Sequence, residues 1–190
     1  MKRKVLYSGI LILVLILATR LIYTNSVDYL LRIKLNNQEK LIVKYEKFIT
    51  DGLVEKSTKF KTTNIQSVID TALSYKGSPN KIGGISKAGI DASGLIYMSL
   101  KKNSKEKFPR IAQEMARYGE RIIDVEKLKK GDLVFFFNTY ETERIITSVG
   151  IYIGNNEFIN SSSSKGVTIS EIDDPYFWKD KFFFGTRIFK

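Results

Sequence analysis

The sequence predicts an α+β domain in which helices come first and a mostly antiparallel sheet follows. Apolar residues recur with helical spacing over residues 65–75 and again over residues 91–102. After residue 133, short apolar runs alternate with turn signals, which is typical of strands. Helices in one half of a domain and strands in the other half indicate the α+β class.

The helical half begins at a capping residue. Asn64 precedes an amphipathic stretch from Ile65 to Tyr75, and this stretch ends before Gly77. A loop rich in glycine leads to a second helix that starts near Asp91. A third, short helix is expected over 113–118. We therefore expect these helices to form one layer against the sheet.

Five strands are expected in the second half, each bounded by turn residues. They cover 133–137, 148–153, 157–160, 167–170 and 182–189. Phenylalanines gather at 135–137 and 182–184. Alternate residues of a strand face the core. One interpretation is therefore that the phenylalanines between them form an exposed apolar face for a partner.

The N-terminal segment has the composition of a membrane anchor. Lys2, Arg3 and Lys4 precede an apolar run, residues 5–23, in which Arg20 is the only charged residue. Such a run is just long enough to cross a bilayer once, with its basic flank in the cytoplasm. A cleaved signal peptide is the alternative.

Three segments divide the chain. Residues 1–24 are the membrane anchor or signal segment, residues 25–63 a juxtamembrane spacer or accessory element, and residues 64–190 the α+β domain. Within the spacer, apolar residues alternate as in a strand between 27 and 35, and a helix over 40–49 is a second interpretation of this segment.

The residue types that are absent limit the chemistry of the chain. Its 190 residues include no cysteine and no histidine, so thiolate chemistry, an imidazole base and the usual zinc ligands are excluded. No cofactor is expected. The acidic group at 171–174 lacks the spacing of a calcium loop and indicates a solvated turn, so no metal site is expected.

A net charge of +11 raises the question of a nucleic-acid partner. Most of the excess lies within residues 1–61, beside the apolar segment, where anionic lipid or wall polymer is the usual partner. The domain shows no stacking platform or groove-reading motif. We therefore expect no nucleic-acid partner.

Short strings follow one another through the domain in a definite order. They are Gly-Gly at 83–84, Asp-Ala-Ser-Gly-Leu at 91–95, Phe-Pro-Arg at 108–110, Leu-Lys-Lys-Gly-Asp-Leu-Val-Phe-Phe at 128–136 and Val-Gly-Ile-Tyr-Ile-Gly at 149–154. In this order and spacing, the stretch from Ile65 to Phe189 resembles the NlpC-type family of bacterial cell-wall cysteine peptidases. The resemblance implies a papain-like fold and a family activity on peptidoglycan peptides.

The resemblance also implies where the catalytic positions of the family fall. The nucleophilic cysteine corresponds to Ala92, the histidine base to Ser148, and the polar residue that orients the histidine to Asn160. A methyl group cannot attack a carbonyl, and a hydroxyl does not hold a proton near neutral pH as imidazole does. The sequence therefore predicts no catalytic residue at these degenerate positions.

Asn80, Asp91 and Ser93 are expected to line the remnant cleft. Asp91 should cap the second helix, and Ser93 should bond to backbone N–H groups in its first turn. The family places a tyrosine before the glycine pair, where this chain has residues 80–82, Asn-Lys-Ile. Serine catalysis by Ser93 is set aside because the family pattern gives no lysine where a base must lie.

These observations lead to one main interpretation and one alternative. The main interpretation is a pseudoenzyme: a non-catalytic pseudopeptidase that acts as a binding or scaffold module for an envelope protein complex or for peptidoglycan. It would cross the bacterial cytoplasmic membrane once, with its C-terminal domain on the periplasmic or wall side. The alternative is a peptidoglycan peptide hydrolase of the NlpC type whose native catalytic residues were altered.

Overall fold

The computed structural model divides the chain into two compact units, residues 1–47 and residues 48–190. The residues that it describes are 39–40, 43–44, 47–48, 60 and 63–189. Those described between 39 and 48 are helical, which agrees with the helical interpretation of the spacer.

The membrane segment expected at 5–23 lies outside the described residues. Within the described part of the chain, no helix is both long enough and apolar enough to cross a bilayer. The segments 1–24 and 25–63 also lie largely outside the described residues, so the division of the chain at residues 24 and 63 stays a prediction.

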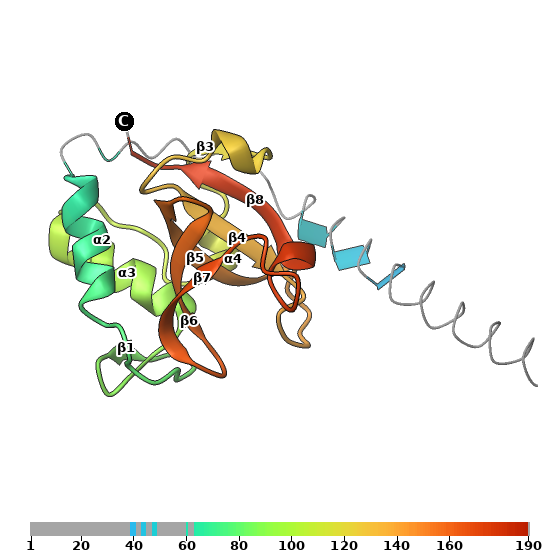
Figure 1. The fold of residues 1–190 in the computed structure, drawn as a ribbon, viewed down its shortest axis with the longest axis horizontal. Coiled ribbons are helices and arrows are strands. Elements are labelled where there is room, and N and C mark those ends of the chain that lie inside the picture. Colours follow the sequence, from blue (N-terminus) through green and yellow to red (C-terminus); the bar gives the residue numbers. More distant parts are fainter. Residues whose placement is uncertain (1–38, 41–42, 45–46, 49–59, 61–62, 190) are drawn as a thin grey trace, which may run out of the picture. The chain divides into compact units, whose positions relative to one another are not determined.

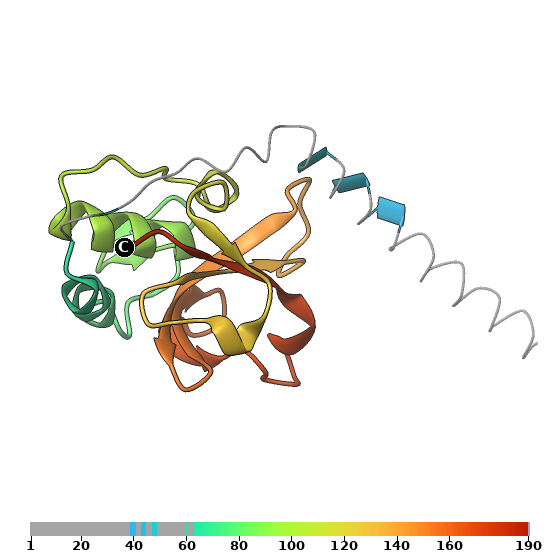
Figure 2. The same cartoon turned by 90° about the horizontal axis from the view of Figure 1, so that it is seen from above.

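Two helices form one layer of the second unit. α2 (Ile65–Leu73) and α3 (Ala92–Asn103) pack against each other at one side of the sheet (Figure 1). Figure 2 shows these helices and the sheet from above. Asn64 caps α2, since its side-chain oxygen accepts a hydrogen bond from the Ser67 N–H at 3.2 Å. The predicted start of this helix is therefore confirmed.

Six strands form the second layer within the described residues. They are β3 (Glu120–Ile122), β4 (Leu133–Phe137), β5 (Ile146–Gly154), β6 (Glu157–Ser162), β7 (Gly166–Glu171) and β8 (Phe182–Arg187). Their order is β3-β8-β4-β5-β6-β7, and every neighbouring pair is antiparallel. The predicted α+β class with a mostly antiparallel sheet is confirmed.

Smaller elements lie between these helices and strands along the chain. β1 (Ile85–Ser86) and β2 (Gly89–Ile90) form a hairpin in the glycine-rich loop, and α4 (Ala112–Met115) is shorter than the helix predicted over 113–118. Two short 3-10 helices, η1 (Val125–Lys127) and η2 (Lys179–Lys181), precede β4 and β8. The hairpin and β3 were not predicted, because two or three residues are too few to show a period.

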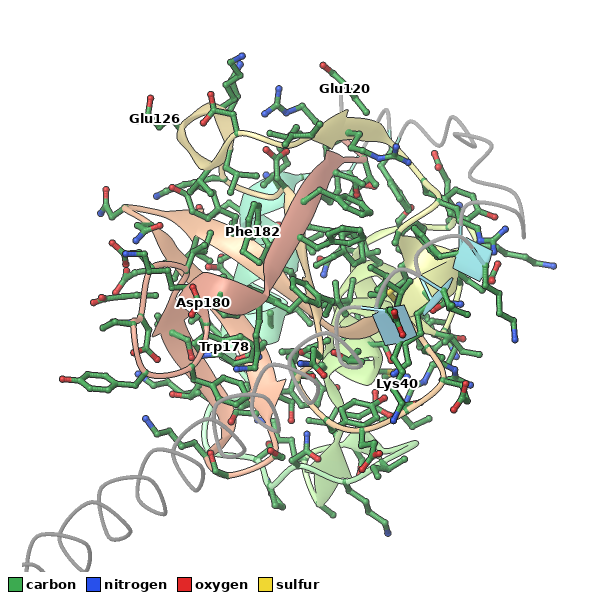
Figure 3. The ribbon with its side chains drawn as sticks, turned by 90° about the vertical axis from the view of Figure 1, so that its right-hand side faces the viewer. Lys40, Glu120, Glu126, Trp178, Asp180 and Phe182 are labelled. Carbon is green, nitrogen blue, oxygen red and sulfur yellow. The ribbon has the colours of Figure 1, made fainter. Side chains whose placement is uncertain are left out.

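The hydrophobic core covers both faces of β4. Phe135 and Phe136 are both fully buried. The Phe135 ring lies 5.5 Å from that of Phe184, and the Phe136 ring lies 4.7 Å from those of Phe158 and Trp178. Figure 3 shows Trp178 on the turn that leads into β8. Because this turn covers the second face of the strand, the expected apolar face for a partner is wrong at these two residues.

Candidate functional site

A cleft of about 420 Å³ opens at the N-terminus of α3. Its walls come from the loop before β1, the starts of α3 and α4, the loop between β4 and β5, the start of β5, the end of β6 and the turn before β8. The predicted site residues that line it are Asn80, Asp91, Ala92, Ser93 and Ser148. The structure therefore brings together five of the six positions that the sequence singled out.

Asp91 joins the start of α3 to the glycine-rich loop. One carboxylate oxygen accepts the N–H of Gly94 and the other accepts the N–H of Gly83, each at 2.6 Å. The predicted capping role of Asp91 is confirmed. Arg110 donates to both carboxylate oxygens, each at 2.9 Å, and so forms a bidentate ion pair with Asp91.

Arg110 also holds Ser93. The guanidinium donates to the Ser93 hydroxyl at 2.8 Å and to the Gly84 carbonyl at 3.0 Å, while that hydroxyl donates to Asp91 at 3.1 Å. Ser93 thus bonds to a charged pair, and the expected bond to backbone N–H groups is wrong. The sequence showed Arg110 only as part of a motif, because its partner lies 19 positions away along the chain.

The pKa of Asp91 is lowered from its ordinary value of 3.8. Burial acts to raise this pKa, but the hydrogen bond from Arg110, the N–H groups of Gly94 and Gly83, and the Arg110 charge together outweigh burial. At neutral pH, Asp91 is therefore a charged carboxylate with a donor on each of its oxygens.

The stabilising effect of Asp91 is expected to depend on pH. Because its folded pKa lies below the unfolded value of 3.8, its contribution is complete above that value and is lost as the pH falls through the folded pKa. We expect Asp91→Asn to lower the free energy of unfolding by about 1–2 kcal/mol at pH 7, and by progressively less below about pH 4. Thermal unfolding of both proteins between pH 7 and pH 2 measures this difference.

Asp173→Asn is the matched control, since Asp173 is exposed. It should leave the melting temperature nearly unchanged at every pH. If Asp91→Asn lowers the free energy of unfolding as much at pH 2 as at pH 7, the stabilising role assigned to the Asp91 carboxylate is contradicted.

Ala92 and Ser148 face the same cleft from different layers. Ala92 is the first residue of α3, where backbone N–H groups have no partner within the helix and the helix dipole favours negative charge. Ser148 lies on β5 opposite Phe136 and is 6% exposed. The geometry therefore places position 92 where an anion is stabilised and position 148 on the opposing wall.

Asn160 is fully buried on β6 and does not line the cleft. Neither its amide nitrogen nor its amide oxygen has a hydrogen-bond partner within the described part of the chain. Tyr152 on β5 lies opposite Phe158 on β6, so their side chains share one face of the sheet. Because side chains alternate along a strand, Ser148, four residues before Tyr152, and Asn160, two residues after Phe158, lie on this same face. An amide there is suitably placed to orient a group at position 148.

Ser161 forms a wall of the cleft that the sequence did not reveal. Asn80 donates to the Ser161 carbonyl at 3.1 Å and to its hydroxyl at 2.9 Å, and this hydroxyl donates to the Ile90 carbonyl at 2.7 Å. These bonds tie the end of β6 to the loop before β1. No sequence signal links residues that are 81 positions apart.

A second hollow of about 600 Å³ shares part of its lining with the cleft. The shared residues are Ser162, Ser163, Phe177 and Trp178. Glu171 and Asp174 also line the second hollow, but no group of three acidic residues is arranged to hold a metal ion within the described ranges. The cleft thus continues past the serine run as a longer groove.

With this geometry established, comparison with known proteins gives consistent matches. The sequence model of the NlpC/P60 family matches residues 77–187. The Escherichia coli K12 protein named "Probable endopeptidase NlpC" is 36% identical over 126 residues, which cover 66% of this chain and 79% of that protein. The E. coli K12 protein named "Murein DD-endopeptidase MepS/Murein LD-carboxypeptidase" is 36% identical over 115 residues, which cover 60% of this chain and 58% of that protein.

A solved structure agrees with the sequence matches. A Staphylococcus aureus protein of the NLP/P60 family, named as similar to lipoprotein, superimposes with a TM-score of 0.59 and 31% identity. The match covers 70% of this chain and 44% of that chain, so the relative is much longer than the part that matches. The papain-like fold predicted for the domain is therefore confirmed.

These relatives correct the functional interpretation. The sequence predicted a pseudoenzyme with a binding or scaffold role, whereas the matched relatives are named as endopeptidases. That prediction is wrong, and the names favour the alternative, a peptide hydrolase. The physical reason is that Ala92 and Ser148 concern only attack and proton transfer, whereas many other side chains form the cleft.

Proposed function

The chain belongs to the NlpC/P60 family, and on this premise we propose that its domain is a peptidoglycan peptide hydrolase of the NlpC type whose native catalytic residues are altered at positions 92 and 148. The observation that carries the proposal is the cleft itself. It has a charge-paired cap at Asp91, a helix N-terminus at position 92 and a second wall at Ser148.

The geometry accounts for the separate requirements of peptide hydrolysis. A nucleophile at position 92 would lie at the N-terminus of α3, where the dipole lowers the pKa of a thiol and unpaired N–H groups can donate to an oxyanion. A base at position 148 would share its sheet face with the amide of Asn160, which has no hydrogen-bond partner among the described residues. The groove beyond Ser162 gives room for an extended peptide.

The peptide part of peptidoglycan is the proposed substrate. Its support is that one relative is named as a murein endopeptidase. The proposed location is the cell envelope, because another relative is named as similar to lipoprotein and because residues 5–23 have the composition of a membrane anchor.

The anchor is tested by extraction. The full chain, expressed in bacteria, is expected to stay in the membrane pellet after washing with alkaline carbonate. A variant that lacks residues 1–24 should move to the supernatant. Release of the full chain by carbonate would contradict the anchor, and a mass that lacks this segment would identify a cleaved signal peptide instead.

Restoring both reactive groups tests the proposed hydrolase. The full chain that carries Ala92→Cys together with Ser148→His is expected to release soluble peptide fragments from purified peptidoglycan, which mass spectrometry detects. The thermal unfolding of this variant confirms that it is folded. A folded double variant that leaves peptidoglycan intact would overturn the proposal.

A further inference from the structure

Only two charged side chains line the cleft within the described residues, Asp91 and Arg144. The negative charge of Asp91 is balanced by the bidentate ion pair with Arg110 and by two backbone N–H groups. Asp91 therefore has little capacity left to attract a cationic ligand. Within the lining of the cleft itself, Arg144 is then the remaining charged side chain.

Arg144 has no ion pair in the part of the chain that the structure describes. Its side chain is exposed, and its backbone N–H donates a long hydrogen bond to the Thr142 hydroxyl, at 3.5 Å. Glu141 and Glu143 are its neighbours in the sequence, but neither forms an ion pair with it. The guanidinium is thus available to a ligand.

The loop that carries Arg144 is fixed at both ends. At one end, the Thr139 N–H and hydroxyl donate to the Thr147 hydroxyl at 2.9 and 2.8 Å. At the other end, the Ile145 N–H donates to the side chain of Gln113 on α4 at 3.1 Å. These bonds position the backbone on either side of Arg144 before any ligand binds, which lowers the entropy cost of binding.

We infer that Arg144 binds a free carboxylate of the substrate, so that the cleft selects acidic peptides; this inference rests on the proposed function. A guanidinium forms two parallel hydrogen bonds with a carboxylate, and the N-terminus of α3 adds a second positive potential in the same cleft. Tyr140, 54% exposed, and Trp178 also line the cleft and add apolar surface to it.

The test uses two peptides that differ in one charge. A γ-linked glutamate is a suitable probe because its α-carboxyl group stays free when its side chain forms the peptide bond. The peptides are L-alanyl-γ-D-glutamyl-L-lysine amide with this carboxyl group free, and the same peptide with it converted to carboxamide. Isothermal titration calorimetry with the full chain compares their affinities.

The free carboxylate is expected to bind about tenfold more tightly than the carboxamide, a difference of ~1.4 kcal/mol. Arg144→Gln should abolish this difference. Arg144→Lys should retain part of it, because lysine keeps the positive charge but cannot form two parallel hydrogen bonds with a carboxylate. Lys130→Gln is the matched control, since it removes one exposed charge outside the cleft, and it should retain the full difference.

The outcomes separate this inference from the proposed function. Equal affinity for both peptides, or a difference that survives Arg144→Gln, would overturn the role of Arg144. If the chain with Ala92→Cys and Ser148→His cleaves both peptides at equal rates, the hydrolase stands and the inference falls. If that variant cleaves neither peptide and leaves peptidoglycan intact, the proposed function fails. The role of Arg144 would still be supported if the preference for the free carboxylate is lost in Arg144→Gln.

Discussion

Peptide hydrolysis by the chain with Ala92→Cys is expected to be at least about 100-fold faster when Ser148→His is also present, because a positioned general base contributes about 10²–10⁴-fold. A thiol at the start of α3 already gains from the helix dipole, but it needs a group that removes its proton and later protonates the leaving amine. Initial rates of the single and double variants on the same peptidoglycan peptide measure the difference.

A histidine placed elsewhere in the groove is the matched control for this prediction. Ser162 lies on β6 and lines both hollows, so Ala92→Cys with Ser162→His has the same composition as the double variant. It should hydrolyse no faster than the single variant, because the introduced imidazole would not occupy the position on β5. Equal rates for the two double variants would show that position 148 is not the site of the base.

Truncation of Phe136 is expected to cause the largest loss of stability. The side chain is fully buried, and its ring lies 4.7 Å from the rings of Phe158 and Trp178 and 6.1 Å from that of Phe182. Phe136→Ala should lower the free energy of unfolding by about 3–5 kcal/mol, through lost burial and the cavity left behind. Urea unfolding measures this loss as a lower midpoint at an unchanged slope.

Phe137→Ala is the matched control on the same strand. Phe137 is only half-buried, so the same truncation should cost about 1–2 kcal/mol. Trp178 contacts Phe136 and also lines the cleft, so Phe136→Ala should weaken peptide binding as well. Equal losses of stability at positions 136 and 137 would contradict the packing described for this face.

The long elements were predictable from the sequence because their apolar residues repeat with a clear period. This applies to α2, α3 and the strands β4 to β8. β1, β2 and β3 are too short to show a period, and hydrogen bonds with partner strands define them. The burial of both Phe135 and Phe136 was also unpredictable, because it depends on which segments cover each face of the sheet.

The site was predictable only where a motif marked it. Asp91, Ala92 and Ser148 fall at motif positions, and the structure gathers them in one cleft. The bonds that organise this cleft join residues far apart in the sequence, such as Arg110 to Asp91 and Gln113 to the backbone beside Arg144. Such bonds depend on how the layers pack, so no local pattern indicates them.

The sequence by itself determined which atoms are present: no thiol, no imidazole, a methyl group at position 92 and a hydroxyl at position 148. It also determined the order of the main helices and strands, because periodicity and capping are local properties. Only the tertiary structure decided that the charge of Asp91 is balanced by Arg110, while Arg144 lines the cleft without an ion pair among the described residues. The physical reason is that charge compensation depends on distances across the fold, which arise only when the helical layer packs against the sheet.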